Sequence, residues 1–244
     1  MNKHPVLDGL AMAGVRLGLD RIRTFLGVLG EPHLCAPVVH IAGTNGKGST
    51  VGMITQVLVE AGYTVGTTTS PHLEHINERV CIQGIPIDDA TLAEAIEHID
   101  RARWEWARSA MIEGQPLTYF EFMVAVAFHV FAQRNVDVMV VEVGMGGRLD
   151  ATNVVQPVAT AITSIGLDHM EELGNDLVTI AIEKAGIFKR GVPAVIGAMD
   201  AGARAAAEAR AKALGCPVWV AGPQLRREAH RDGTFSLSTP GGSL

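Results

Sequence analysis

The chain has 244 residues, of which 48% are hydrophobic and 19% are charged; this length and composition exclude a disordered chain and allow a full core without disulfides or a structural metal. Its net charge of −6 argues against a nucleic-acid-binding protein, and its three widely spaced cysteines argue against a disulfide framework or a zinc knuckle. The start lacks a signal-peptide pattern and no apolar run reaches the about 20 residues that span a bilayer, so we expect a soluble cytoplasmic protein without nucleic-acid or membrane partners.

Helical and strand patterns alternate along the chain. In chain order they predict a helix at 20–29, a strand at 38–42, a helix at 47–61, strands at 64–68 and 80–82, helices at 91–112 and 120–133, strands at 136–143 and 158–164, a helix at 177–188, a strand at 194–196, a helix at 201–214 and a strand at 218–221. This order predicts an α/β fold with a doubly wound, mostly parallel sheet. A small hairpin around Asp232-Gly233 is expected to follow the last strand.

The clearest motif is HIAGTNGKGST at residues 40–50, which follows a strand and opens a helix. Glycines let backbone N–H groups curl around an anion, and the helix start adds free N–H groups and a positive dipole end. Lys47 adds a charge for nucleotide phosphates, and Ser49 or Thr50 adds a hydroxyl. The strict P-loop pattern has glycine at the position of Ile41 and no residue equivalent to Gly48, so an ordinary glycine-rich turn is the alternative.

Two further residues follow predicted strands at the same edge of the sheet. Glu142 ends the strand 136–143, where an acidic residue of a P-loop fold holds Mg²⁺; the alternative is an ion pair with Arg148. His169 follows the strand 158–164. A lone histidine near a strand end is more often structural than a ligand, and Asp168 competes with it as the residue that faces a metal.

These segments resemble the folylpolyglutamate synthase/dihydrofolate synthase family of Mur-type ATP-dependent amide ligases. The matching segments run in family order: LGLDR at 17–21, HIAGTNGKGST at 40–50, SPHL at 70–73, NERV at 77–80, TYFE at 118–121, VEVGMGGRLDATNV at 141–154, TSIGLDHM at 163–170 and IEKAGIFK at 182–189. The segments GGRLDATN and EKAGI distinguish this family from other P-loop proteins.

The resemblance implies roles for individual residues. It implies that ATP phosphates are bound by Thr44, Asn45, Gly46, Lys47, Gly48, Ser49 and Thr50. It implies that two Mg²⁺ ions are held by Ser70, Glu142, His169 and a carbamylated Lys184, and that Lys47, Lys184 and His169 act in catalysis; the alternative for Lys184 is a solvated helix lysine. It implies that the pterin site is lined by Thr118, Tyr119, Phe120, Glu121, Leu149, Asp150 and Ala151.

Some of these assignments have chemical support of their own. The Asp150 carboxylate can accept hydrogen bonds from an aminopyrimidinone edge, and Phe120 offers a ring face for stacking, although a core aromatic is an equal alternative for Phe120. Leu17 is expected to border the pterin. His72, Glu78 and Arg79 lie in the loop 70–79, which either closes over the substrate or is a solvated loop.

The reaction implied by the resemblance is ATP-driven amide formation. A pteroate or folate carboxylate attacks the γ-phosphorus of ATP, and the amine of L-glutamate then displaces phosphate from the acyl phosphate. The expected partners are therefore dihydropteroate, folates and L-glutamate, with a monomeric full-length enzyme. The alternatives are another Mur-type amino-acid ligase and a nucleotide-binding module that is inactive without a second domain.

The resemblance also sets an expected domain organisation. We expect residues 1–238 to form the ATP-binding domain and 239–244 to begin a linker to a C-terminal ligase domain that this chain does not contain. Because the family's active site lies between the two domains, we expect the chain alone to have little ligase turnover.

Overall fold

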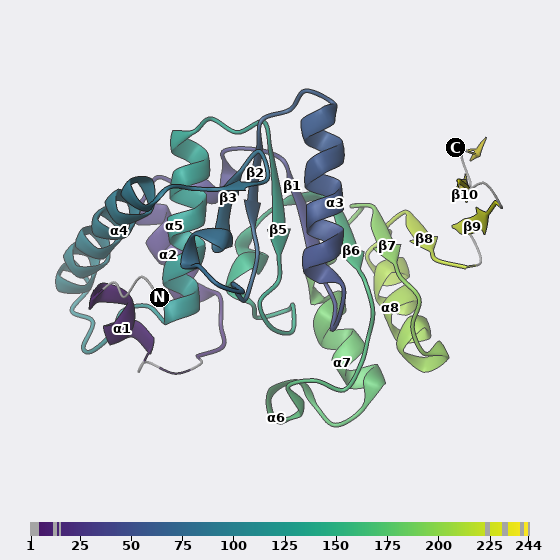
Figure 1. The fold of residues 1–244 in the computed structure, drawn as a ribbon. Helices are drawn as coiled ribbons and strands as arrows, with labels where there is room; N and C mark the ends of the chain where they lie inside the picture. The colour runs from purple at the N-terminus through teal and green to yellow at the C-terminus, as the bar shows by residue number, and fades with distance from the viewer. Residues whose placement is uncertain are drawn as a thin grey trace.

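The computed structural model describes residues 5–11, 14, 16–222, 225–230, 234–239 and 242–243. The strands of the main sheet are β1 (Val38–Ala42), β2 (Val65–Thr68), β3 (Val80–Ile82), β4 (Ile85–Pro86), β5 (Val138–Glu142), β6 (Pro157–Ile162), β7 (Ala194–Ile196) and β8 (Val218–Val220). They form one eight-stranded sheet in the order β4-β3-β2-β5-β1-β6-β7-β8 (Figure 1). The strands from β2 to β8 in this order are parallel, whereas β3 and β4 pair antiparallel at one edge.

The helices cover both faces of the central strands. They are α1 (Pro5–Ala11), α2 (Asp20–Val28), α3 (Lys47–Glu60), α4 (Asp89–Ser109), α5 (Tyr119–Gln133), α6 (Met170–Leu173), α7 (Leu177–Lys184) and α8 (Ala201–Ala213). Val51 of α3 packs with Ile41 and Val140 on one face, and Val141 packs with Phe128 of α5 on the other. Because successive side chains of a strand point to opposite faces, this double cover explains the unbroken apolar run in β5.

Side-chain caps determine where most of the longer helices begin. Asp88, Thr118, Asp176 and Asp200 each accept a hydrogen bond from a backbone N–H in the first turn of α4, α5, α7 and α8. The helix α3 instead begins after Gly46, which has a left-handed conformation and provides no side-chain cap. The start of α3 therefore keeps its N–H groups available for another partner.

The fold agrees with the one predicted from the sequence. The mostly parallel, doubly wound sheet is confirmed, and each predicted strand has a counterpart. The helix predicted at 177–188 ends at Lys184, because residues 185–187 tighten into the 3-10 turn η4 (Ala185–Ile187) where Gly186 packs against Arg148. The helices α1 and α6 and the two-residue strand β4 were not predicted, since they are too short to show a periodic pattern.

A second, three-stranded sheet lies near the end of the chain. The strands β9 (Arg226–Ala229), β10 (Phe235–Thr239) and β11 (Gly242–Ser243) pair antiparallel. The pairing of β9 with β10 confirms the predicted hairpin, whose turn at Asp232-Gly233 lies outside the described residues. Within the expected linker 239–244, Thr239 pairs with Gly242. The domain boundary placed there stays a prediction.

The carboxyl ends of β1, β2, β5 and β6 meet at one edge of the sheet, because these four strands are neighbours and parallel. The loops that leave them are 43–46, 69–79, 143–150 and 163–169. Ligands of open α/β sheets bind at this edge. Of the residues assigned by resemblance, these loops contain Thr44, Asn45, Gly46, Ser70, Leu149, Asp150 and His169.

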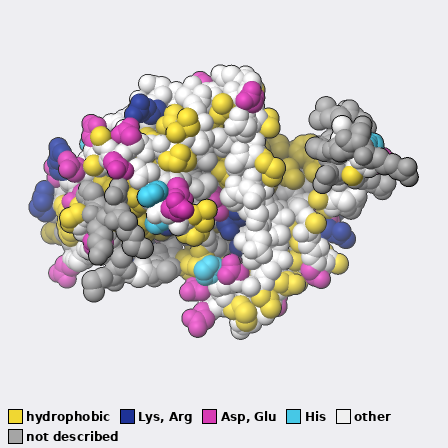
Figure 2. All heavy atoms as spheres, viewed as in Figure 1, with side chains coloured by type: hydrophobic (Ala, Val, Ile, Leu, Met, Phe, Trp, Pro, Cys, Tyr) yellow, Lys and Arg dark blue, Asp and Glu magenta, His cyan; other side chains and the backbone are white. Residues whose placement is uncertain are grey.

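Hydrophobic side chains also reach the surface, and Figure 2 shows a group of them over α6 and α7. Met170 of α6 and Val178 and Ile182 of α7 are among the exposed ones. Even so, no helix within the described ranges combines the length and apolarity needed to cross a membrane.

Candidate functional site

The glycine-rich loop between β1 and α3 has a geometry that suits an anion. Gly43 has φ +149°, and a Cβ there would lie 1.9 Å from Thr163 Oγ1, so only glycine fits. The first backbone bond of the helix runs from the Thr50 N–H to the Gly46 carbonyl at 3.0 Å. The N–H groups of residues 47–49 therefore have no carbonyl within the helix, and donors at a helix start suit an anion such as a phosphate.

Thr44 and Asn45 are engaged with the loop that follows β6. The Thr44 N–H donates to the Ser164 carbonyl at 2.9 Å, and its hydroxyl donates to the Gly166 carbonyl and accepts from the Gly166 N–H. The Asn45 N–H donates to Ser164 Oγ at 3.0 Å. In this structure these two residues hold the loop in place. Their expected phosphate contacts stay a prediction.

Lys47 and Glu142 face each other across the start of α3. The Lys47 ammonium donates to the Thr44 carbonyl at 3.2 Å and lies 4.0 Å from Glu142 Oε1. Burial raises the pKa of Glu142, and the nearby Lys47 offsets this only in part. The alternative ion pair with Arg148 is wrong, since Arg148 pairs with Glu183 at 2.9 Å.

Lys184 is buried beside the same loop. It is 3% exposed and donates from Nζ to the Gly43 carbonyl at 3.0 Å. Burial, together with the charge of Lys47, lowers the pKa of Lys184 to about 8. The alternative of a solvated helix lysine is therefore wrong, and this amine contacts the candidate phosphate site.

The residues expected to bind Mg²⁺ supply only some of the ligands that this ion needs. Glu142 Oε2 accepts from the Ser70 N–H at 3.4 Å, so this buried carboxylate has weak protein partners and suits a divalent cation. His169 is half exposed, and its Nε2 lies 3.6 Å from Asp168 Oδ1. No cluster of three or more His, Cys, Asp or Glu residues that could hold a metal occurs in the described part of the chain. Such a partial set is compatible with Mg²⁺, which keeps waters and uses substrate phosphates as ligands.

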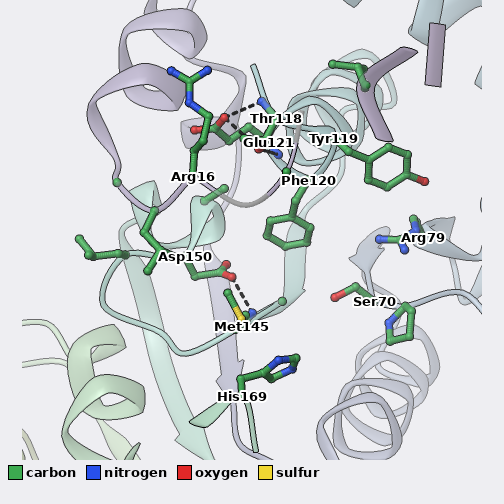
Figure 3. Close-up of a pocket in the computed structure, with 18 residues that line it drawn as sticks. Arg16, Ser70, Arg79, Thr118, Tyr119, Phe120, Glu121, Met145, Asp150 and His169 are labelled. Carbon is green, nitrogen blue, oxygen red and sulfur yellow. Dashed lines mark hydrogen bonds between the residues drawn. The ribbon is translucent and has the colours of Figure 1, made fainter. Parts of the chain in front are cut away.

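A cavity of about 670 Å³ opens at the same edge of the sheet, beside the loops that follow β2, β5 and β6. It is lined by all of the residues assigned by resemblance to the pterin site: Thr118, Tyr119, Phe120, Glu121, Leu149, Asp150 and Ala151. Ser70, His169 and Leu17 also line it, as do Arg16 and Arg79. In Figure 3 the Phe120 ring stands between Asp150 on one side and Ser70 and Arg79 on the other. Segments far apart in sequence thus form one site.

The start of α5 forms one wall of this cavity. The Thr118 side chain and the Glu121 carboxylate close the helix start reciprocally as a capping box, and Glu121 Oε1 lies 3.0 Å from the Arg21 guanidinium. The Phe120 ring packs so closely on Gly144 that a Cβ there would lie 2.4 Å from Phe120 Cζ. Thr118 and Glu121 thus have a structural role, and Phe120 faces the cavity rather than the core alone.

Asp150 is a buried carboxyl group in the cavity wall. Its Oδ1 accepts from the N–H and the hydroxyl of Thr152, and its Oδ2 accepts from the Met145 N–H at 2.8 Å. Burial raises the pKa of Asp150, while these hydrogen bonds lower it. Donors reach both oxygens and favour the ionised form against the larger effect of burial, which raises the pKa.

The loop 70–79 is held by its own side chains. Glu78 accepts from the N–H groups of Leu73, Glu74 and His75, which lowers its pKa to about 2. Arg79 donates from Nε to His72 Nδ1 at 2.9 Å, and its guanidinium lies over the Tyr119 ring. The loop is therefore ordered at the cavity mouth. Whether it closes over a substrate stays a prediction.

The two segments that distinguish the family pack against each other. A Cβ at Gly147 would lie 2.7 Å from the Lys184 carbonyl oxygen. The Arg148 N–H donates to the Glu183 carbonyl, and the Asn153 amide donates to the Arg148 and Gly186 carbonyls. These contacts fix the cavity wall to the end of α7 that carries Lys184.

Several residues at the site had no role in the sequence interpretation. Arg16, Gly144 and Met145 line the cavity. Thr152 forms a hydrogen bond with Asp150, and His40 forms one with Thr152. His40 lies inside the loop motif and Thr152 inside GGRLDATN, but no spacing rule connects positions 112 residues apart.

Comparisons with known proteins were made for sequence and for structure. The Mur ligase middle domain family matches residues 41–239. The dihydrofolate synthase/folylpolyglutamate synthase of Bacillus subtilis (strain 168) is 46% identical over 197 residues, covering 78% of this chain and 44% of that protein. The protein of the same name from Escherichia coli (strain K12) is 40% identical over 191 residues, covering 78% and 43%. The chain thus spans about half the length of the curated relatives it matches.

Two solved structures have a similar fold. E. coli FolC in complex with DHPP and ADP superposes with a TM-score of 0.87 at 35% identity, covering 98% of this chain and 55% of that chain. An FPGS-AMPPCP-folate complex superposes with a TM-score of 0.87 at 36% identity, covering 97% and 59%. The likeness therefore extends over nearly all of the present chain.

Proposed function

The chain belongs to the Mur ligase family, whose middle domain matches residues 41–239, and on this premise we propose that it is the ATP-binding part of an amide ligase joining L-glutamate to dihydropteroate or to a folate. Relatives named dihydrofolate synthase/folylpolyglutamate synthase support the reaction class. The solved FolC and FPGS complexes with ADP, AMPPCP, DHPP and folate support the ligand classes.

One observation carries the proposal: an unbroken path of contacts joins the glycine loop to the cavity. Lys47 lies beside Glu142, Glu142 accepts from the Ser70 N–H, and Ser70 lines the same cavity as Asp150. A nucleotide with its γ-phosphate at Lys47 therefore lies next to the end of a ligand whose other end reaches Asp150. Such proximity is what phosphoryl transfer to a carboxylate requires.

The residues of the loop have distinct tasks in the proposed reaction. The substrate carboxylate attacks the γ-phosphorus, ADP leaves, and the amine of glutamate then displaces phosphate from the acyl phosphate. The N–H groups of residues 47–49 and the Lys47 ammonium hold the phosphates and offset the charge that grows as two anions meet. This catalysis rests on positioning and charge rather than on a covalent enzyme intermediate.

Mg²⁺ is the implied metal. Glu142, Ser70, His169 and a carbamylated Lys184 would hold it, and when bound it neutralises phosphate charge. The pKa of about 8 supports carbamylation of Lys184, because a fraction of the amine is then neutral near pH 7. We retain a cytoplasmic location, a monomeric full-length enzyme and a separate ligase domain as parts of this proposal.

Calorimetric titration of the 244-residue chain tests the proposal. ATP with Mg²⁺ and dihydropteroate are each expected to bind, whereas a UDP-linked cell-wall precursor is expected not to bind. ADP release in the presence of dihydropteroate, glutamate and Mg²⁺ is expected to be slow for this chain alone. Binding of the UDP-linked compound but not of dihydropteroate would instead favour another Mur-type amino-acid ligase.

A further inference from the structure

A chain of hydrogen bonds runs from the middle of the sheet to the cavity. His40, in β1, is fully buried, and its Nε2 lies 2.9 Å from Thr152 Oγ1. The Thr152 hydroxyl donates to Asp150 Oδ1. Among the described residues that line the cavity, Asp150 is present and His40 and Thr152 are not. These two residues therefore reach the cavity indirectly, and their hydrogen bonds lead to Asp150.

The protons of this chain can be assigned from its donors and acceptors. A threonine hydroxyl has one proton, and Thr152 gives it to Asp150, so Thr152 accepts from His40. His40 then carries its proton on Nε2, and its Nδ1 is the unprotonated nitrogen. Among the described residues, none forms a hydrogen bond with the buried Nδ1. Burial lowers the pKa of His40 to about 3, so the imidazole stays neutral.

The two oxygens of Asp150 differ in consequence. Oδ1 accepts two hydrogen bonds, both from Thr152, and these occupy its lone pairs. Oδ2 accepts from the Met145 N–H at 2.8 Å, and the backbone N–H of Gly144 also approaches the carboxylate and lowers its pKa; Figure 3 shows the bond from Met145 at the cavity wall. Oδ1 is thus fixed by Thr152, whereas Oδ2 is the oxygen that can accept a hydrogen bond from a ligand.

We propose that His40 and Thr152 are positioning residues that lock Oδ1 of Asp150 and direct Oδ2 to an N–H donor of the ligand in the cavity. The identification of that ligand as a pterin rests on the proposed function. The N-cap of the turn η3 (Ala151–Val154) explains the bond from the Thr152 N–H to Asp150. It does not explain His40, because an apolar side chain would fill that place in β1 without an unpaired nitrogen.

Substitutions that separate the hydroxyl from the shape of Thr152 test the proposal. Thr152→Val keeps the shape and removes the hydroxyl, and Thr152→Ser keeps the hydroxyl. We expect Thr152→Val to weaken dihydropteroate binding about tenfold without changing ATP binding, and Thr152→Ser to stay near the parent chain. The matched control is Thr160→Val, because the Thr160 hydroxyl is equally buried and donates to the Pro193 carbonyl, away from the cavity.

His40 is tested in the same assay. His40→Leu removes the donor and is expected to weaken dihydropteroate binding severalfold, and His40→Gln restores an N–H donor and part of the binding. Equal binding by His40→Leu and the parent chain, or a loss with Thr152→Val no larger than with Thr160→Val, overturns the proposal. Thermal unfolding identifies variants that fail to fold; if Thr152→Val is one of them, the comparison of His40→Leu with His40→Gln carries the test.

A second measurement is independent of the ligand. The bonds from Thr152 lower the pKa of Asp150, so a ¹³C NMR titration of that carboxylate is expected to show a higher pKa in Thr152→Val than in the parent or in Thr160→Val. An unchanged pKa overturns the proposed locking. A parent chain that binds no dihydropteroate but shows the pKa rise contradicts the proposed function and leaves the locking of Asp150 supported.

Discussion

The glycine loop and the cavity lie at the same edge of the sheet, but they are built in different ways. The loop is one continuous segment, and its chemistry comes from backbone N–H groups, Gly43 and Lys47. The cavity takes its walls from distant segments, and its chemistry comes from the buried side chain of Asp150. The helix α3 starts without a side-chain cap, whereas the start of α5 is closed by Thr118 and Glu121.

This difference separates two ways of making a ligand site. At an uncapped helix start the backbone N–H groups are themselves the donors for an anion, so the helix that belongs to the fold also forms the site. The N–H groups of a capped helix start are already paired, so the helix only lines the cavity. Ligand recognition then depends on side chains that are fixed by residues outside the cavity. Substitutions that change the backbone conformation should therefore abolish binding at the loop, whereas single side-chain substitutions should weaken binding in the cavity.

The largest effect is expected for Gly43→Ala. The new Cβ would meet Thr163 Oγ1, and φ is positive, so we expect a loss of about 4 kcal/mol in the free energy of unfolding, together with loss of ATP binding. Urea unfolding and calorimetry measure these. The control Gly27→Ala lies in the exposed part of α2 with open space around it, and we expect it to be neutral or stabilising by about 0.5 kcal/mol. Equal stability of the two variants would contradict the steric account.

Next in size is a pH effect at Lys184. Its pKa is about 8 in the folded chain and 10.5 ordinarily, so between these values the unfolded chain binds more protons. The free energy of unfolding should therefore rise with pH in this range, by on the order of 3 kcal/mol at full extent. Comparing the parent chain with Lys184→Met, in degassed buffer with a chelator, isolates this rise. The same pH slope in both proteins would refute a depressed pKa.

In the cavity, Asp150→Asn is expected to act on one ligand only. An amide that keeps its oxygen towards Thr152 turns its NH₂ towards the Met145 N–H, so two donors face each other. We expect dihydropteroate to bind about 30-fold more weakly, equivalent to about 2 kcal/mol, while ATP binding is unchanged. Asp137→Asn is the control, since that carboxylate accepts from the Thr64 N–H away from the cavity. An equal loss of ATP affinity would mean that loop and cavity are not separable.

The smallest effect is expected for the ion pair of Arg148 and Glu183, which joins the cavity wall to α7. Arg148 is largely exposed, so a double-mutant cycle with Arg148→Ala and Glu183→Gln should give a coupling of about 0.5 kcal/mol. The close packing of Gly147 and Gly186 holds the two regions together instead. A coupling above about 2 kcal/mol would show that the side chains carry this connection.

The sequence predicted the loop side of this comparison better than the cavity side. The limits of β1 and β7 were predicted to the residue, and the start of α3 at Lys47 followed from the glycine motif. The cavity residues were grouped only through the resemblance, because Thr118 and Asp150 show no spacing pattern that links them. The hydrogen bond from His40 to Thr152 was not predicted, because each residue lies in a motif in which other residues had the assigned roles.

By itself the sequence determined the succession of helices and strands, the mostly parallel sheet, the glycine loop and the family. Those features depend on local periodicity, glycine conformations and contiguous motifs. Only the tertiary structure decided that Lys184 is buried against Gly43, that Arg148 pairs with Glu183 and that Oδ1 of Asp150 accepts from the Thr152 hydroxyl. The reason is physical: burial, charge compensation and hydrogen-bond direction depend on which distant groups the packed sheet brings within about 3 Å of one another.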